Sequence, residues 1–152
     1  MISELKTILF AMTPIFELRG TIPLAVGLWQ LPLLKTFFLA VLGNIIPIFF
    51  LLWFWKNLAG YLMKKSKTIN QFFNWLFKRT QKRFYKKYSI YGDMALILFV
   101  AIPLPFTGAW TGTIVSFLFD IPYKKSLGLI FIGIVIAGII VSLATLGVIS
   151  II

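Results

Sequence analysis

The chain has 152 residues, of which 60% are hydrophobic, and its mean hydropathy is +0.96. Soluble domains of this length do not reach such values, so we expect an integral membrane protein. With no cysteine, no histidine and four acidic residues, the chain lacks the groups for disulfides, zinc sites and thiol or histidine catalysis, and we expect neither an enzyme nor a metal or other cofactor. The net charge of +11 fits basic loops facing anionic lipids better than a nucleic-acid partner.

The first apolar segment, residues 7–31, is interrupted at its centre. The interruption holds two charges, a glycine and two prolines, namely Pro14, Glu17, Arg19, Gly20 and Pro23. A charge near the bilayer centre costs at least about 2.5–3.5 kcal/mol. Irregular backbone at that depth is tolerated only inside protein or beside a wet cavity. The flanking runs, 7–16 and 22–29, are each about half a membrane long, which favours a helical hairpin that enters and leaves on one side. A kinked, fully spanning helix is the alternative.

After a break at Pro32, residues 37–55 are nearly all apolar and long enough to span a membrane. Within this run Gly43, Asn44 and Pro47 form a polar, kinkable spot. Asn44 is either a helix–helix hydrogen-bonding group or a ligand. We expect an interfacial aromatic belt around the end of the run, at Trp53, Trp55, Lys56 and Tyr61.

The segment 64–89 is polar and basic. Its apolar side chains recur at the spacing i, i+3, i+4, i+7, at Ile69, Phe72, Phe73 and Leu76. Six basic residues follow closely, at Lys78, Arg79, Lys82, Arg83, Lys86 and Lys87. This pattern predicts a basic amphipathic helix in the headgroup plane, with residues 64–87 contacting anionic headgroups. The alternative is a docking site that senses lipid headgroups.

The second half repeats this organisation. Asp93 is expected to cap a half-membrane run at 94–102, and Asp120 a helix at 126–152 that is long enough to span. Between them lies a second interruption, with Pro103, Pro105, Thr107, Gly108, Trp110 and Thr111. Gly108 and Gly112 permit close backbone approach. In the long helix we expect a small-residue packing face at Gly133, Gly138 and Ser142.

Sliding the chain against itself by ninety positions aligns the two interruptions and also Pro32 with Pro122. If the interrupted segments are re-entrant hairpins, each unit crosses the membrane once and the repeat is inverted. Residues 56–87 and 124–125 then share one side, which collects twelve of the fifteen basic residues. The positive-inside rule therefore favours hairpins, with the basic segment cytoplasmic and both termini outside. Full spans, in a parallel repeat, remain the alternative.

The charged centre suggests a division of roles. Glu17 and Arg19 are two positions apart and would not face each other on a regular helix, but they can do so at an unwound hairpin tip. Burial raises the pKa of a carboxyl group, and a neighbouring guanidinium lowers it. These opposing effects suit proton exchange near neutral pH. Glu17 is thus a candidate proton carrier and Arg19 a candidate anion ligand, with a purely structural ion pair as the alternative.

The motifs ELRGTIP at 17–23 and PLPFTGAWTG at 103–112 resemble the two signature motifs of the small multidrug export protein family, which is distantly similar to the DedA/VTT superfamily. The resemblance covers nearly the whole chain. It implies a multi-pass protein of the prokaryotic inner (plasma) membrane, with two re-entrant hairpins facing each other across an inverted repeat. It also implies ion-coupled transport or lipid translocation.

We therefore expect an all-α integral membrane protein with a single membrane domain, 1–152. Two repeats of a re-entrant hairpin plus a transmembrane helix, 7–62 and 92–152, are joined by the basic interfacial helix 64–89. The leading hypothesis is a proton- or ion-coupled transporter of an anionic or amphiphilic substrate. A flippase or scramblase for anionic lipid carriers such as polyprenyl phosphate, and a non-transporting membrane assembly factor, are the alternatives. So small a chain is expected to form a homo-oligomer, most simply a dimer. The candidate substrate- or ion-binding residues are Pro14, Glu17, Arg19, Gly20, Pro23, Asn44, Pro103, Pro105, Thr107, Gly108, Trp110 and Thr111.

Overall fold

The computed structural model describes residues 1–103 and 107–150, and for residues 83–91 it describes the backbone alone. Every regular element among these residues is helical, which confirms the predicted all-α class. The elements are α1 (Ile2–Met12), α2 (Glu17–Gly27), α3 (Leu33–Phe54), the π-helical turn η1 (Trp55–Ala59), α4 (Gly60–Lys65), α5 (Lys67–Tyr91), α6 (Asp93–Ala101), α7 (Ala109–Leu118) and α8 (Tyr123–Ile149). α3, η1 and α4 follow one another without a break and form one continuous helix, Leu33–Lys65. Among the described residues, this helix and α8 (Tyr123–Ile149) are the two that are long and apolar enough to cross a membrane.

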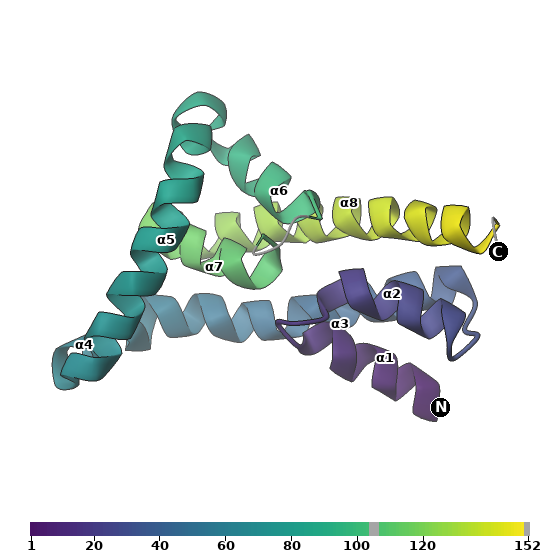
Figure 1. The fold of residues 1–152 in the computed structure, drawn as a ribbon. Helices are drawn as coiled ribbons and strands as arrows, with labels where there is room; N and C mark the ends of the chain where they lie inside the picture. Colours follow the sequence, from purple (N-terminus) through teal and green to yellow (C-terminus); the bar gives the residue numbers. More distant parts are fainter. Residues whose placement is uncertain (104–106, 151–152) are drawn as a thin grey trace.

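The first interrupted segment forms two separate helices and not one kinked helix. α1 starts at Ile2 and ends at Met12. Pro14 disfavours helical backbone at the preceding residue, and Thr13 is accordingly extended, with φ −80° and ψ 145°. α2 begins at Glu17, and the chain turns back between α1 and α2 (Figure 1).

The two long helices form the centre of the arrangement. α3 and α8 lie side by side and run in opposite directions (Figure 1). The α1–α2 hairpin and the α6–α7 hairpin lie along different halves of this pair, so that their turns meet near its middle. Both chain termini lie at one end of the molecule, whereas α4, α5 and the start of α8 lie at the other (Figure 1).

Each half of the chain has the same order of elements, a pair of half-length helices followed by a long helix. Gln30 and Asp120 occupy equivalent turns ninety positions apart, and both have a left-handed backbone, with φ 51° and 50°. Pro32 and Pro122 follow as the N-cap residues of α3 and α8, with φ −56° and −57°. The link from each hairpin to its long helix therefore repeats in backbone detail.

Glycines let the first helix of each hairpin approach its long helix closely. A Cβ atom on Gly43 of α3 would lie 2.5 Å from the carbonyl oxygen of Ile8 in α1. One on Gly133 of α8 would lie 2.6 Å from Cβ of Val100 in α6. Gly138 lies against the ring of Phe37 in α3, so the predicted small-residue face of α8 does contact neighbouring helices.

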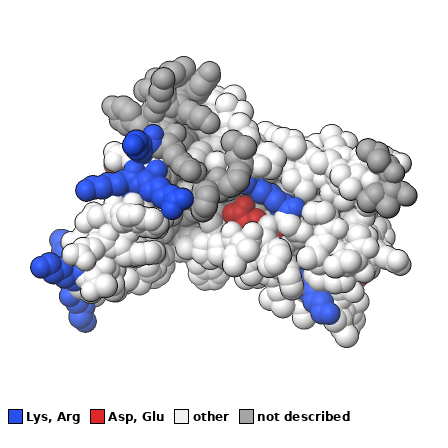
Figure 2. Space-filling model, in the orientation of Figure 1, with Lys and Arg blue, Asp and Glu red and all other residues white. Residues whose placement is uncertain are grey.

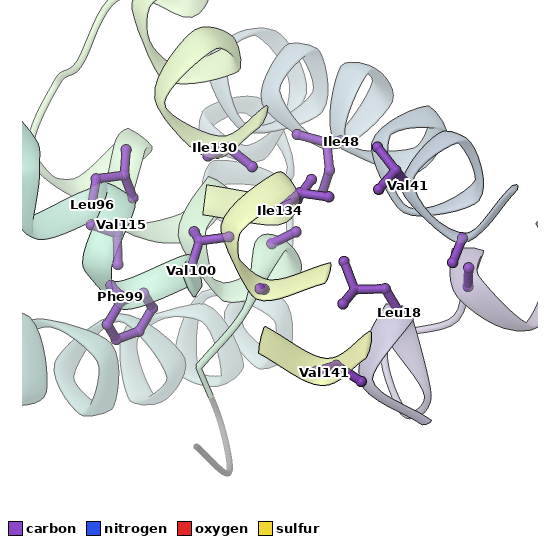
Figure 3. Packing of buried hydrophobic residues seen from close by; sticks show 14 of the residues in the cluster. Leu18, Val41, Ile48, Leu96, Phe99, Val100, Val115, Ile130, Ile134 and Val141 are labelled. Carbon is purple, nitrogen blue, oxygen red and sulfur yellow. The ribbon is translucent and has the colours of Figure 1, made fainter. Parts of the chain in front are cut away.

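The apolar core joins both hairpins to both long helices. Leu18 of α2, Ile48 of α3, Val100 of α6 and Ile134 of α8 are all almost fully buried within one cluster. Figure 3 shows Ile134 near the centre of this cluster, with Val100 and Leu18 on either side of it. The core thus holds the two hairpins on one common pair of helices.

Two predicted helix caps are wrong. Gly92, with φ 54°, is the N-cap residue of α6, and Asp93 is its first helical residue. The Asp93 carboxylate pairs with the Lys125 ammonium at the start of α8, 2.6 Å away. Pro122, and not Asp120, is the N-cap residue of α8. Proline presets a φ near −65° and brings no donor that needs a partner, which suits it to the start of a helix.

The predicted aromatic belt is wrong at Trp55. Trp53 and Tyr61 are exposed, but Trp55 is 6% exposed, and its Nε1–H donates a hydrogen bond to Oγ1 of Thr113 in α7 at 3.0 Å. Residues two positions apart lie on opposite sides of a helix, so Trp53 and Trp55 cannot face the same surroundings. Trp55 instead contacts the ring of Phe73 in α5.

The apolar stripe of α5 is divided between the protein and the exterior. Phe73 and Phe77 pack in the cluster around Trp55, whereas Phe72 and Trp75 are 56% and 55% exposed. Lysine and arginine side chains gather over α4 and α5 (Figure 2). The contact of residues 64–87 with lipid headgroups stays a prediction, and Arg83, Lys86 and Lys87 lie outside the described side chains.

Candidate functional site

The turn of the first hairpin brings Glu17 into an unusual backbone conformation. Thr13 closes the end of α1 by donating from both its amide and its hydroxyl to the carbonyl oxygen of Phe10. The amide of Glu17 then donates to the carbonyl oxygen of Thr13 at 3.0 Å. Glu17 has a φ of +45°, a left-handed conformation that costs a non-glycine residue about 1–2 kcal/mol. The surrounding contacts must offset that cost, and such strain is often found at functional positions.

The Glu17 carboxylate is buried against the second hairpin. It is 6% exposed, and its Oε1 accepts a hydrogen bond from the backbone amide of Trp110 at 3.3 Å. The amide of Ala109 also donates to this carboxylate. Both amides belong to the first turn of α7, whose unpaired N–H groups and dipole attract an anion. Glu17 therefore supplies the negative charge at the start of a helix in the other half of the chain.

Gly108 makes this contact possible. It is the N-cap residue of α7, has a φ of +134°, and lies so close to Glu17 that a Cβ atom would be 2.4 Å from Oε2. A side chain at this position would push the carboxylate away from the helix. Gly112, the second glycine predicted to allow close approach, lies against Val100 of α6.

Arg19 binds the end of α6, on the other side of the same break. Its Nη1 donates to the carbonyl oxygen and to Oγ1 of Thr107, at 3.1 and 3.2 Å. Its Nη2 donates to the carbonyl oxygens of Val100 and Ile102, at 3.1 and 3.2 Å. A cation is favourable at this helix end, where the last carbonyl groups have no partner within the helix. The first hairpin thus provides a carboxylate for the start of α7 and a guanidinium for the end of α6.

The two charges also lie near each other, as their predicted pairing requires. Nε of Arg19 is 3.9 Å from Oε2 of Glu17, which is a long ion-pair contact. Figure 2 shows acidic and basic atoms together in a hollow near the middle of the molecule, where the hairpin turns meet in Figure 1.

A pocket of about 630 Å³ opens between the two hairpin turns and is called the central pocket below. Its lining residues are Pro14, Ile15, Phe16, Glu17, Arg19, Gly20, Pro103, Thr107, Trp110 and Thr111. The structure therefore gathers most of the predicted site residues around one space, although they come from two distant stretches of the chain.

Four predicted site residues are not among the lining residues of this pocket, and one of them is Gly108, which lies against the Glu17 carboxylate. Pro23 lies exposed within α2, and Asn44 is buried in α3. Pro105 lies outside the described residues. The carbonyl oxygens of Val100 and Ile102 could not be predicted as partners of Arg19, because a backbone acceptor has no residue signature. Thr113, which accepts from Trp55 and donates to the carbonyl oxygen of Trp110, was also not predicted.

Comparison with known proteins identifies one family. A family model described as "Putative small multi-drug export protein" matches residues 17–140. The matched region contains both motifs on which the resemblance rests, so that resemblance is confirmed, while the relation to the DedA/VTT superfamily stays a prediction. Searches of curated proteins and of solved structures found no match.

Proposed function

The chain belongs to the small multi-drug export protein family, and from this premise we propose that it is a proton- or ion-coupled membrane transporter whose substrate passes through the central pocket. Family membership favours a transporter over an enzyme. In this proposal the α1–α2 and α6–α7 hairpins are re-entrant segments of an inverted repeat, and α3 and α8 are the membrane-spanning helices. The basic segment 64–89 is cytoplasmic and both termini are outside. The substrate is an anionic or amphiphilic compound, and the protein works as a homodimer.

The observation that carries this proposal is the position of the Glu17 carboxylate. It is buried, it lines the central pocket, and it accepts hydrogen bonds from the first amides of α7. Protonation removes the charge that the start of α7 attracts and so weakens the contact between the hairpins. Binding or release of one proton at Glu17 is thereby linked to opening or closing of the pocket.

Arg19 has a different role in this conformation. Its two terminal nitrogens donate to the break between α6 and α7, so Arg19 positions the second hairpin. An anionic substrate gains access to the guanidinium when it takes the place of one of these carbonyl acceptors. Substrate binding then loosens the same hairpin contact that protonation of Glu17 loosens, which couples the two events.

Flux measurements in liposomes test the coupling. Purified protein is expected to move an amphiphilic anion only while a proton gradient is present, and Glu17→Gln is expected to abolish that flux. Glu4→Gln removes a similar carboxylate from the partly exposed start of α1 and is expected to leave flux unchanged. Unchanged flux in Glu17→Gln refutes the coupling role. Translocation of fluorescent anionic lipids without any gradient supports the flippase instead, and wild-type complementation by a Glu17→Ala/Arg19→Ala double variant supports an assembly factor.

The proposed topology has its own test. The native chain has no cysteine, so Asp120→Cys provides a single label site between α7 and α8. If the hairpins are re-entrant, an impermeant thiol reagent labels this site only after cells are permeabilised. Labelling in intact cells would mean four full crossings and would refute the facing-hairpin arrangement.

A further inference from the structure

A second cavity, of about 240 Å³, lies between α5 and the second hairpin and is called the α5 cavity below. Its walls include Trp75 from α5, Phe99 from α6 and Ile114 from α7. Phe99 and Ile114 are 5% and 8% exposed, so they form a firm apolar wall, whereas Trp75 is 55% exposed and forms the outer side. At about 30 Å³ for each water, the space equals roughly eight water molecules, enough for a small aromatic or alkyl group.

One charged side chain lies at this cavity. Arg79 is among its lining residues, and its guanidinium carbon is 5.4 Å from the centre of the Trp75 ring. A guanidinium beside an aromatic face combines recognition of planar or tetrahedral anions with stacking on a flat apolar group. Lys78 and Lys82 lie exposed on the same helix, so the approach to the cavity is positively charged, and Figure 2 shows basic side chains gathered over this part of the molecule.

We infer that the α5 cavity is a binding site for organic anions that carry a compact apolar group. The apolar group occupies the space between Trp75, Phe99 and Ile114, and the charged end contacts the guanidinium of Arg79. A neutral compound of the same shape lacks the contact with the guanidinium, and a small inorganic anion lacks the contact with the apolar walls. The cavity therefore selects for molecules that have both parts.

The α5 cavity also adjoins the central pocket. Thr111 of α7 lines both spaces. The two spaces therefore share a wall at this side chain. We place the cavity on the substrate's route from the basic helix to the central pocket. This step, unlike the binding itself, rests on the proposed transport function.

Binding is tested with the full-length protein in detergent micelles, with 2-naphthalenesulfonate as the probe and 2-naphthalenemethanol as its neutral counterpart, after subtraction of binding to empty micelles. Arg79→Gln is expected to weaken sulfonate binding about tenfold or more, because a hydrogen-bonded charge is lost. Lys78→Gln makes the same change of charge at the next residue and is expected to leave the affinity within about twofold, because an exposed charge is screened. Trp75→Ala is expected to weaken binding of both probes.

Each result supports or overturns the inference. Equal losses of affinity in Arg79→Gln and Lys78→Gln would mean general attraction to a basic surface. An unchanged affinity in Trp75→Ala would mean that the naphthalene ring of the probe binds elsewhere. Either result overturns the binding site. Trp75, Lys78 and Arg79 are all exposed, so variants at these positions are expected to fold, and circular dichroism checks this. Thr111→Leu enlarges the side chain that lines both spaces and is expected to lower flux, and unchanged flux refutes the proposed route. Sulfonate binding that follows the expected pattern, in a protein that shows no flux at all, refutes the transport function and leaves the binding site standing.

Discussion

Replacing Gly108 with alanine places a methyl group inside the contact between the two hairpins. The new Cβ atom would lie 2.4 Å from Oε2 of Glu17 and 2.8 Å from Oε1, well inside van der Waals distance. Because the nearest atoms are the two carboxylate oxygens, the side chain of Glu17 must move away from the first turn of α7. The substitution thus separates the hairpins at a single point without removing any charge.

The expected cost has two parts. A φ of +134° is sparsely populated by alanine and costs about 1–3 kcal/mol. Loss of the hydrogen bonds between the buried carboxylate and the amides of α7 costs about 1.5–3 kcal/mol more. We therefore expect Gly108→Ala to lower the free energy of unfolding by about 2.5–6 kcal/mol. Flux should also fall, because the Glu17 carboxylate no longer accepts hydrogen bonds from the start of α7.

Thermal unfolding in detergent, followed by circular dichroism, measures this cost. Gly128→Ala in α8 is the matched control, since no heavy atom lies within 4 Å of its new Cβ and the change should raise stability by up to about 1 kcal/mol. In a Glu17→Ala background the carboxylate is already absent, so the part of the cost that comes from its lost hydrogen bonds should vanish. About 1–3 kcal/mol of backbone strain should remain. Full stability and flux in Gly108→Ala, or equal costs in both backgrounds, would refute the proposed contact.

Three further outcomes are expected. Arg19→Lys should lower the free energy of unfolding by about 1–3 kcal/mol, because a lysine ammonium cannot span the separate carbonyl oxygens that the guanidinium fork reaches; unchanged thermal unfolding would argue against that role. Gly43→Ala and Gly133→Ala should each destabilise the protein by about 1–3 kcal/mol through overpacking, and wild-type melting of either would contradict the close helix contact. The pKa of Glu4 is lowered by its hydrogen bond to the Lys35 ammonium, so its contribution to stability is present above the ordinary carboxyl pKa and is lost as the pH falls through the lowered value. Thermal melts between about pH 5 and pH 2 should show this loss, and Glu4→Gln should remove that part of the slope.

The breaks in the helices could be predicted from the sequence because their causes are local. Pro14 acts on the residue directly before it, and Gly108 supplies a backbone conformation that other residues avoid. The burial of Glu17 and the partial burial of Arg19 were also predictable, since charges within a long apolar segment need a protein environment.

The partners of these charges could not be predicted in the same way. Arg19 donates to carbonyl oxygens 81 to 88 residues further along the chain, and every residue offers the same carbonyl group. Asp93 was misassigned for a related reason, because its ion pair with Lys125 forms only after α6 and α8 have packed together. Local sequence rules identify which groups require a partner, and tertiary packing decides which partner each one finds.

The two hairpins differ in what their turns require. The first closes largely on itself, through the bonds of Thr13 and the amide of Glu17. The second receives a carboxylate at the start of α7 and a guanidinium at the end of α6 from the first. The second hairpin therefore depends on the first for its packing, and this order is the order in which the two are synthesised. The N-terminal half leaves the ribosome already carrying both groups that the C-terminal half needs, and a C-terminal half made alone lacks the carboxylate and the guanidinium that its helix ends receive from the first hairpin.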